Sequence, residues 1–210
     1  MSGTSASDIT TEQKDAKREG IKPKDLITIG IFTAIMILVY FISSMVAFIP
    51  VLTPLLCVVA PIIGGIPFML FATKTKKFGM VTIMGVLIGI IYALMGTAVW
   101  LTVTSPIFAL LADLIMRSGN YASSKKDVLG YGVYSIACIG TFIPVIFTRD
   151  AYVARLLDTG YTLEYAQAVL NVIPDWSLIL LLLACFVSGI IGGLLGRAML
   201  KKHFVRAGIA

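Results

Sequence analysis

Long runs of apolar residues without a charge dominate this chain. The longest holds 48 consecutive residues, between Asp25 and Lys74, with no Asp, Glu, Lys or Arg. Three further charge-free blocks cover residues 78–112, 128–148 and 176–196. A helix of roughly 20 apolar residues crosses a bilayer core, where the backbone must satisfy its own hydrogen bonds. The four blocks therefore predict an integral membrane protein with about six spans.

Prolines divide the longest blocks into segments of membrane-crossing length. Pro50 and Pro54 interrupt the first block. Ser105-Pro106 predicts a helix start, because proline is tolerated in a first helical turn, where its missing donor would be unpaired anyway. The pattern predicts an all-α bundle of six transmembrane helices within residues 22–203, with spans at about 26–48, 55–72, 79–101, 106–117, 128–147 and 176–200.

The distribution of charge predicts the orientation of these spans. The chain has 17 Lys and Arg against 11 Asp and Glu, a mean hydropathy of +0.95 and 13% charged residues. With the amino terminus inside, all of the basic residues except Arg149 and Arg155 fall on the cytoplasmic side, as the positive-inside rule requires. Both termini are therefore expected in the cytoplasm, with residues 1–21 as a disordered tail and 204–210 as a second tail. The excess of basic residues then indicates orientation rather than nucleic-acid binding.

The connection at residues 148–175 is predicted to be external and is longer than the others. Leu163, Ala166, Val169 and Leu170 recur within it at helical spacing. Two interpretations are open: a solvated connector with one short helix, or a lid over an external pocket, since long loops in compact domains are often functional.

Small residues are spaced so that helices can approach closely. Gly30 and Ala34 lie one turn apart on the first span and are candidates for docking another protein. In spans three and six the glycine stripes predict packing within the chain's own bundle; they are Gly85, Gly89, Gly189, Gly192, Gly193 and Gly196.

With its length, six expected spans, small-residue pair and long fifth connection, the chain resembles the substrate-binding (S) components of energy-coupling factor (ECF) transporters. The entry sequence KDLITIGIFTAI is similar to the Trep_Strep group of such proteins. The resemblance implies a multi-pass protein of the bacterial plasma membrane that captures a small nutrient, such as a vitamin, a precursor or a related cofactor, on the external side.

The same resemblance implies the partners. A transmembrane coupling (T) subunit would dock at Gly30 and Ala34, although family members usually have alanine where this chain has Gly30. Two cytoplasmic ATPases would supply the energy. The sequence contains no GxxxxGK[ST] phosphate loop, so ATP is expected to be used by the partners and no cofactor is assigned to this chain.

Candidate ligand contacts follow from the expected topology. The predicted substrate-binding residues at the external ends of the spans are Trp100, Phe142, Phe147, Arg149, Asn171, Asp175 and Trp176. The aromatic residues could clamp a flat ligand, or the tryptophans could belong to the interfacial aromatic belt. Arg149 could bind an anionic group, or form a salt bridge with Asp150 or Asp175. Asp175 could also cap the last helix.

Asp113 and the cysteines are the remaining candidates within the spans. Asp113 precedes Arg117 by four residues, so the two are expected to pair on one helix face, in a structural or coupling role; ligand or proton chemistry is the alternative. Cys57, Cys138 and Cys185 lack CxxC spacing, which favours buried small side chains over a disulfide or a metal site.

Two other classes of membrane protein are weighed against this interpretation. An enzyme is disfavoured because the one histidine, His203, lies in the basic tail and no nucleophile–base pair or metal-ligand cluster is evident in the spans. A self-sufficient secondary carrier or channel is the stronger alternative. A proton-coupled carrier usually has several ionisable groups near the midplane, whereas Asp113 stands alone.

Overall fold

A computed structural model describes residues 20–96 and 99–204, and this part of the chain is helical without any strand. The all-α class is therefore confirmed. The tails predicted at 1–21 and 204–210 lie almost wholly outside the described residues. The α-helices are α2 (Pro23–Ser44), α3 (Leu56–Lys74), α4 (Met80–Leu94), α5 (Leu101–Ser118), α6 (Ser124–Ser135), α7 (Ile143–Phe147), α8 (Arg149–Asp158), α9 (Leu163–Val172) and α10 (Ser177–Met199). Shorter 3₁₀ segments are η1 (Met45–Phe48), η2 (Pro50–Leu55) and η3 (Ile136–Thr141), and the described part ends in a π-helical turn, η4 (Leu200–Phe204).

Among the described residues, four helical segments are long and apolar enough to cross a membrane: Pro23–Phe48, Pro50–Lys74, Leu101–Ser118 and Ser177–Lys202. A fifth, Met80–Leu94, is apolar but shorter. The segment predicted as span five is divided into α6, η3 and α7. Pro144 lies in the first turn of α7, so its missing donor falls where a helix leaves its N–H groups unpaired.

The boundary between α4 and α5 differs from the sequence prediction. Span three was expected to reach residue 101, but α4 ends at Leu94, and Gly96 follows with a positive φ of 67°. The next helix begins at Leu101 and contains Pro106, which was expected to start it. The prediction relied on the preference of proline for a first turn, whereas α5 accommodates Pro106 in its second turn at the loss of one backbone hydrogen bond.

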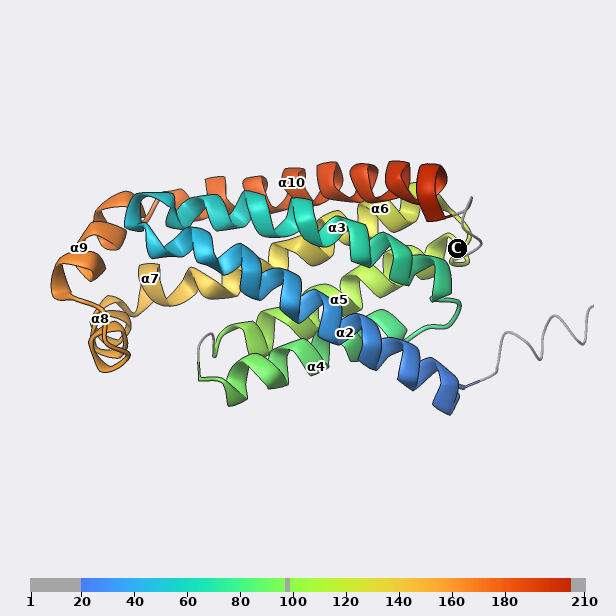
Figure 1. Ribbon diagram of the computed structural model, residues 1–210, viewed down its shortest axis with the longest axis horizontal. Coiled ribbons are helices and arrows are strands. Elements are labelled where there is room, and N and C mark those ends of the chain that lie inside the picture. Colours follow the sequence, from blue (N-terminus) through green and yellow to red (C-terminus); the bar gives the residue numbers. More distant parts are fainter. Residues whose placement is uncertain (1–19, 97–98, 205–210) are drawn as a thin grey trace, which may run out of the picture.

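The two ends of the bundle differ in what they carry (Figure 1). α3 and α10 run side by side along one face, and α2 crosses the bundle beside α3. The described chain ends, near Gly20 and Phe204, lie at the same end as the α3–α4 and α5–α6 connections. α8 and α9 lie at the opposite end. Most of the described Lys and Arg residues lie at the end of the bundle that carries the described chain ends, in or beside the α3–α4 and α5–α6 connections.

The interior consists of two groups of buried side chains. One joins α2, α3, α4, α5 and α6 around Phe68, whose ring lies 4.6 Å from that of Tyr131 and 5.5 Å from that of Tyr134. The other joins the start of α3 with η3, α7, α9 and α10, and contains Phe142. Tyr40 of α2 packs against both groups.

The contact between α3 and α10 depends on glycine. A Cβ atom added to Gly192 would lie 2.3 Å from the Pro61 carbonyl oxygen, and one added to Gly65 would lie 2.1 Å from the Gly192 backbone. Gly196 is equally close to Gly65. No side chain fits at such distances, so the backbones of the two helices touch, as in small-residue packing in membranes. The prediction that the glycines of span six pack within the bundle is confirmed.

A hydroxyl of α10 also compensates for a proline in α3. Pro61 has no N–H, so the carbonyl of Cys57, four residues earlier, loses its helical hydrogen-bond donor. Ser188 Oγ of α10 donates to that carbonyl at 2.8 Å. The same hydroxyl is also within hydrogen-bond distance of the Ala184 carbonyl in its own helix, so its one proton is shared between the two helices. Ser188 thus offers the Cys57 carbonyl a donor where no water is at hand in a bilayer.

Asp113 holds the start of α4. It is fully buried, and its Oδ2 accepts hydrogen bonds from the Gly79 N–H (2.8 Å), the Thr82 N–H (3.2 Å) and the Thr82 hydroxyl (2.9 Å). Tyr121 donates to its other oxygen at 2.8 Å. Exposed N–H groups and the helix dipole favour a carboxylate at this position. The expected pairing with Arg117 is corrected: that guanidinium instead lies over the ring of Phe78, 5.0 Å from its centroid.

Candidate functional site

A cavity of about 690 Å³ lies toward the end of the bundle that carries α8 and α9. Its walls come from the second half of α2, the start of α3, the end of α4, the start of α5, η3 and α7, and α8 and α9 add the outermost part. Segments far apart in the sequence therefore meet around it. A cavity of this volume is in the range of small-molecule binding sites.

The inner part of the cavity is mainly aromatic and apolar. Tyr134 and Phe142 are almost completely shielded from solvent, and both line it. Tyr40 of α2 and Tyr92 of α4 supply further rings, and Trp100, which lies in the turn before α5 and is 43% exposed, also lines the cavity. Several Ser and Thr residues, such as Ser105 and Thr141, also line the cavity. Aromatic walls with a small number of hydroxyl groups favour a flat ligand with a large apolar surface.

The outer part of the cavity carries hydroxyl groups from α8 and α9. Tyr152, Tyr161 and Tyr165 line it, and the rings of Tyr161 and Tyr165 lie 4.6 Å apart. The Tyr165 hydroxyl donates to the Ala47 carbonyl of η1, which connects α9 to the end of α2. Burial raises the pKa of Tyr152 to about 12, so its hydroxyl is protonated at neutral pH.

One cation faces this cavity. Arg155 of α8 is the one residue with a formal charge among the described residues that line it. Its Nη2 atom is buried and has no hydrogen-bond partner in the described part of the chain. A buried guanidinium nitrogen without an acceptor is costly, because that nitrogen has lost its water without gaining another hydrogen-bond partner.

Only some of the predicted ligand contacts line the cavity. Trp100 and Phe142 line the cavity. The other five line neither this cavity nor the groove described below; they are Phe147, Arg149, Asn171, Asp175 and Trp176. Phe147 and Trp176 are about two-thirds exposed, as expected for the alternative interpretation of an interfacial belt for Trp176. A contact between these five residues and a ligand stays a prediction.

Arg149 forms a salt bridge, which is the alternative to ligand binding that the sequence offered for it. It begins α8, and its guanidinium forms an exposed salt bridge with Asp175, which lies just before α10. Arg155, which the sequence analysis used only to fix orientation, takes the position facing the cavity. A signal was available, because Tyr152, Arg155 and Thr159 recur at helical spacing and all three line the cavity.

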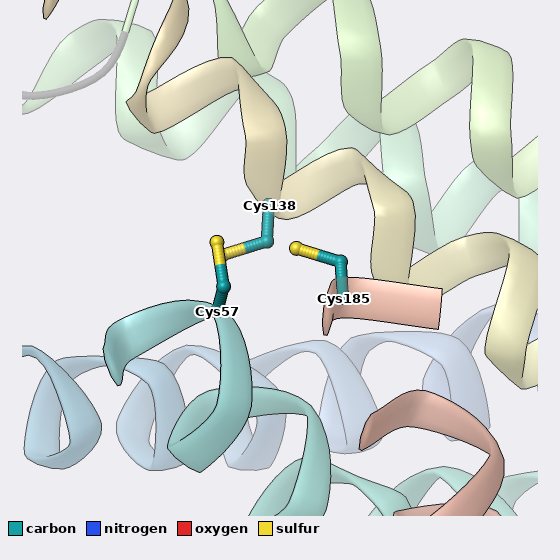
Figure 2. A group of neighbouring side chains, drawn as sticks. All are labelled: Cys57, Cys138 and Cys185. Carbon is teal, nitrogen blue, oxygen red and sulfur yellow. The ribbon is translucent and has the colours of Figure 1, made fainter. Parts of the chain in front are cut away.

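Three cysteines meet beside the cavity (Figure 2). Cys57 of α3, Cys138 of η3 and Cys185 of α10 point toward one another, and their sulfur atoms all lie within 4.8 Å of each other. All three are free thiols, and Cys138 also lines the cavity. Three sulfur ligands suit a thiophilic ion such as Zn²⁺ or Cu⁺. Sequence spacing could not reveal this group, because the cysteines come from three separate helical segments.

A second hollow is an apolar groove of about 500 Å³ between α2 and α4. Gly30 and Ala34 line it together with Leu38, Leu87 and Ile91. A Cβ atom added to Gly30 would meet nothing within 4 Å, so this chain's own packing does not require a glycine there. The groove therefore offers a smooth surface to a helix from outside the chain.

Comparison with known proteins identifies the family. The sequence profile of Trep_Strep, described as a hypothetical bacterial integral membrane protein family, matches residues 23–206. The chain belongs to the Trep_Strep family. No curated protein and no solved structure matches it significantly.

Membership of Trep_Strep settles where the chain resides. The matched region includes all four helices of membrane-crossing length, so this is a bacterial integral membrane protein that crosses the plasma membrane several times. Its exposed apolar residues on α2, α5 and α10 are then in contact with lipid rather than water. The description of the family assigns no activity to its members.

Proposed function

We propose that this Trep_Strep protein is the substrate-capture subunit of an ECF-type ABC importer. It binds a small nutrient on the external side and delivers it together with an ATP-driven coupling module. The observation that carries the proposal is the large aromatic-lined cavity at the end of the bundle opposite the basic connections.

The proposed orientation follows from charge. If the helical segments make six crossings, the positive-inside rule puts the basic end, with both termini, in the cytoplasm. The cavity and the helices α8 and α9 then face the outside, where a scarce nutrient is collected. α8 and α9 act as its cover, with the Tyr165 hydroxyl bonded to Ala47.

The proposed coupling site is the groove at Gly30 and Ala34. Its occupant is a helix of the transmembrane coupling subunit, which needs a close approach to α2. The unoccupied space beside the Gly30 backbone supports this role. ATP hydrolysis belongs to the two cytoplasmic ATPases bound to that subunit, consistent with the lack of a phosphate-binding loop in this sequence.

The experiment that tests this function uses proteoliposomes. The chain is reconstituted alone, and in parallel with a coupling subunit and two ATPases from a bacterium that contains it. Compounds retained through mild-detergent purification are identified by mass spectrometry and then used as the transport substrate. ATP-dependent uptake only by the complete assembly is the expected result. Uptake by the isolated chain would instead support a self-sufficient carrier or channel.

A further inference from the structure

We propose that Arg155 is the anion-recognition residue of the cavity and that the ligand is a flat, mainly apolar molecule with a single carboxylate. This inference deepens the capture function proposed above and rests on it. It assigns the ligand a chemical class and an orientation, with the acid group toward α8 and the apolar part toward α5 and η3.

The state of the Arg155 side chain is the first argument. Its Nη2 atom is buried without a partner in the described part of the chain. Charged groups removed from water are strongly destabilising unless an acceptor or counter-ion replaces it. A protein retains such a group when a ligand completes the pair, and the guanidinium fork matches a carboxylate through two parallel hydrogen bonds.

The charge balance of the lining is the second argument. The described lining contains one cation and no carboxylate. One unpaired positive charge is neutralised by one negative charge. A dianionic phosphate would retain an uncompensated charge at the edge of a low-dielectric region, where that is expensive. A monocarboxylate is therefore favoured over a phosphate ester.

The distribution of polar groups is the third argument. Tyr152, on the same helix as Arg155, and Tyr161, just after that helix, line the cavity with Arg155, and their hydroxyls can donate to a carboxylate. The part of the lining that comes from α2, α4 and the start of α5 is mainly apolar and aromatic, with Trp100 among its rings and a few hydroxyls such as that of Ser105. A ligand with one acidic end and one extended apolar end matches both parts of the lining.

Arg149 provides the matched control. It is the other outward-facing arginine, six positions earlier in the same helix, and it is already paired with Asp175. Removing it deletes the same charge from α8 without changing the described cavity lining. A general effect of charge near the membrane surface would affect both arginines, whereas recognition of a ligand in the cavity depends on Arg155.

The test uses pyrenebutyrate and its neutral analogue pyrenebutanol, which share a flat ring system and differ in the acid group. Binding to the purified full-length chain in nanodiscs is followed by energy transfer from Trp100 in a Trp176→Phe background. We expect the acid to bind at least about tenfold more tightly than the alcohol, as a charge-assisted pair predicts. Arg155→Met and Arg155→Gln should abolish that preference, and Arg149→Gln should retain it.

A ligand-free measurement makes the test independent of the probe. Because a buried guanidinium nitrogen without an acceptor is destabilising, Arg155→Met should raise the melting temperature of the ligand-free chain, whereas Arg149→Met should not. Equal binding of acid and alcohol by the Arg155-containing chain, including no binding of either, would overturn the inference. Loss of the preference in Arg149→Gln would overturn it as well, as would a lower melting temperature in both Arg155→Met and Arg155→Gln.

The two proposals fail separately. If the acid preference depends on Arg155 but the chain transports without a coupling module, the ligand class stands and the importer function is wrong. If uptake requires the coupling module but the preference is missing, the importer function stands and the assignment of Arg155 is wrong.

Discussion

Two faces of this protein carry small residues at the same four-residue spacing, and they have opposite surroundings. On α10, the faces of Gly192 and Gly196 are filled by the backbone of α3 at distances that exclude any side chain. On α2, Gly30 faces an open groove, with nothing within 4 Å of the place where a Cβ would lie. The spacing indicates that helices can approach closely, but only the structure shows whether the approaching helix belongs to the same chain.

The largest effect is expected from adding a side chain to the closed face, the face of α10 at Gly192 and Gly196 that contacts α3. Gly192→Val places a side chain where the Pro61 carbonyl oxygen lies 2.3 Å from the added Cβ, so α3 and α10 must separate. We expect a loss of about 3 kcal/mol or more, enough to prevent recovery of folded protein. The measurement is the yield of monodisperse protein in size-exclusion chromatography and its melting temperature. A stable Gly192→Val variant would contradict the close contact.

A side chain added to the open face, the face of α2 at Gly30 and Ala34, should leave the stability of the fold unchanged and weaken docking. Gly30→Leu has room within the chain, so the melting temperature and the compound retained during purification should not change. Association with the coupling subunit and ATP-dependent uptake should fall by at least about tenfold, because a bulky side chain blocks close helix approach. Pull-down and uptake measure this effect, with Gly30→Ala as the conservative control. Unchanged association would remove the docking role from the groove.

A smaller effect tests the polar contacts beside the closed face. Tyr131 donates its hydroxyl to the Pro61 carbonyl at 2.7 Å, and a Cβ added to Gly64 would lie 2.8 Å from the same hydroxyl oxygen. Tyr131→Phe should cost about 1 kcal/mol by leaving that carbonyl without this donor. Gly64→Ala should be tolerated better in the Tyr131→Phe background than alone. A double-mutant cycle on melting temperatures measures this coupling, and additive effects would contradict the contact.

The smallest effect is a pH dependence of stability that comes from Asp127, near the start of α6. This helix packs against α10. Burial raises the pKa of Asp127 to about 6, and Arg197 of α10 partly opposes the shift. Because this value is above the ordinary 3.8, the stability that comes from the protonated carboxyl is present at low pH and is lost as pH rises through about 6. The melting temperature of the unmodified chain should therefore fall slightly between pH 5 and pH 7, relative to Asp127→Asn. Parallel melting curves for the two proteins would contradict this.

Sequence reasoning succeeds where one local rule decides the outcome. The break around Pro50 and Pro54 and the helix over Leu163 to Leu170 are both present, because proline and hydrophobic period act over a few residues. It was less successful between α4 and α5, where Gly96 ends one helix early and Pro106 is tolerated inside the next.

The candidate site was only partly predictable, because it is assembled from distant segments. Trp100 and Phe142 were identified from their expected position near the external side, and both line the cavity. The sequence predicts a ligand contact for Arg149 at the end of a span and none for Arg155, whereas it is Arg155 of α8 that lines the cavity. The convergence of the cysteines is equally invisible to spacing, since it depends on how α3, η3 and α10 pack.

The hydrogen bond from Ser188 to the Cys57 carbonyl bears on how the protein is made. It joins residues 131 positions apart, so α3 leaves the ribosome long before its donor is synthesised. Until α10 arrives, that carbonyl must rely on the insertion machinery or on residual water near the translocon. We therefore expect the packing of α3 to be completed only when α10 is in place, and truncation before α10 should yield a product that quality-control proteases remove.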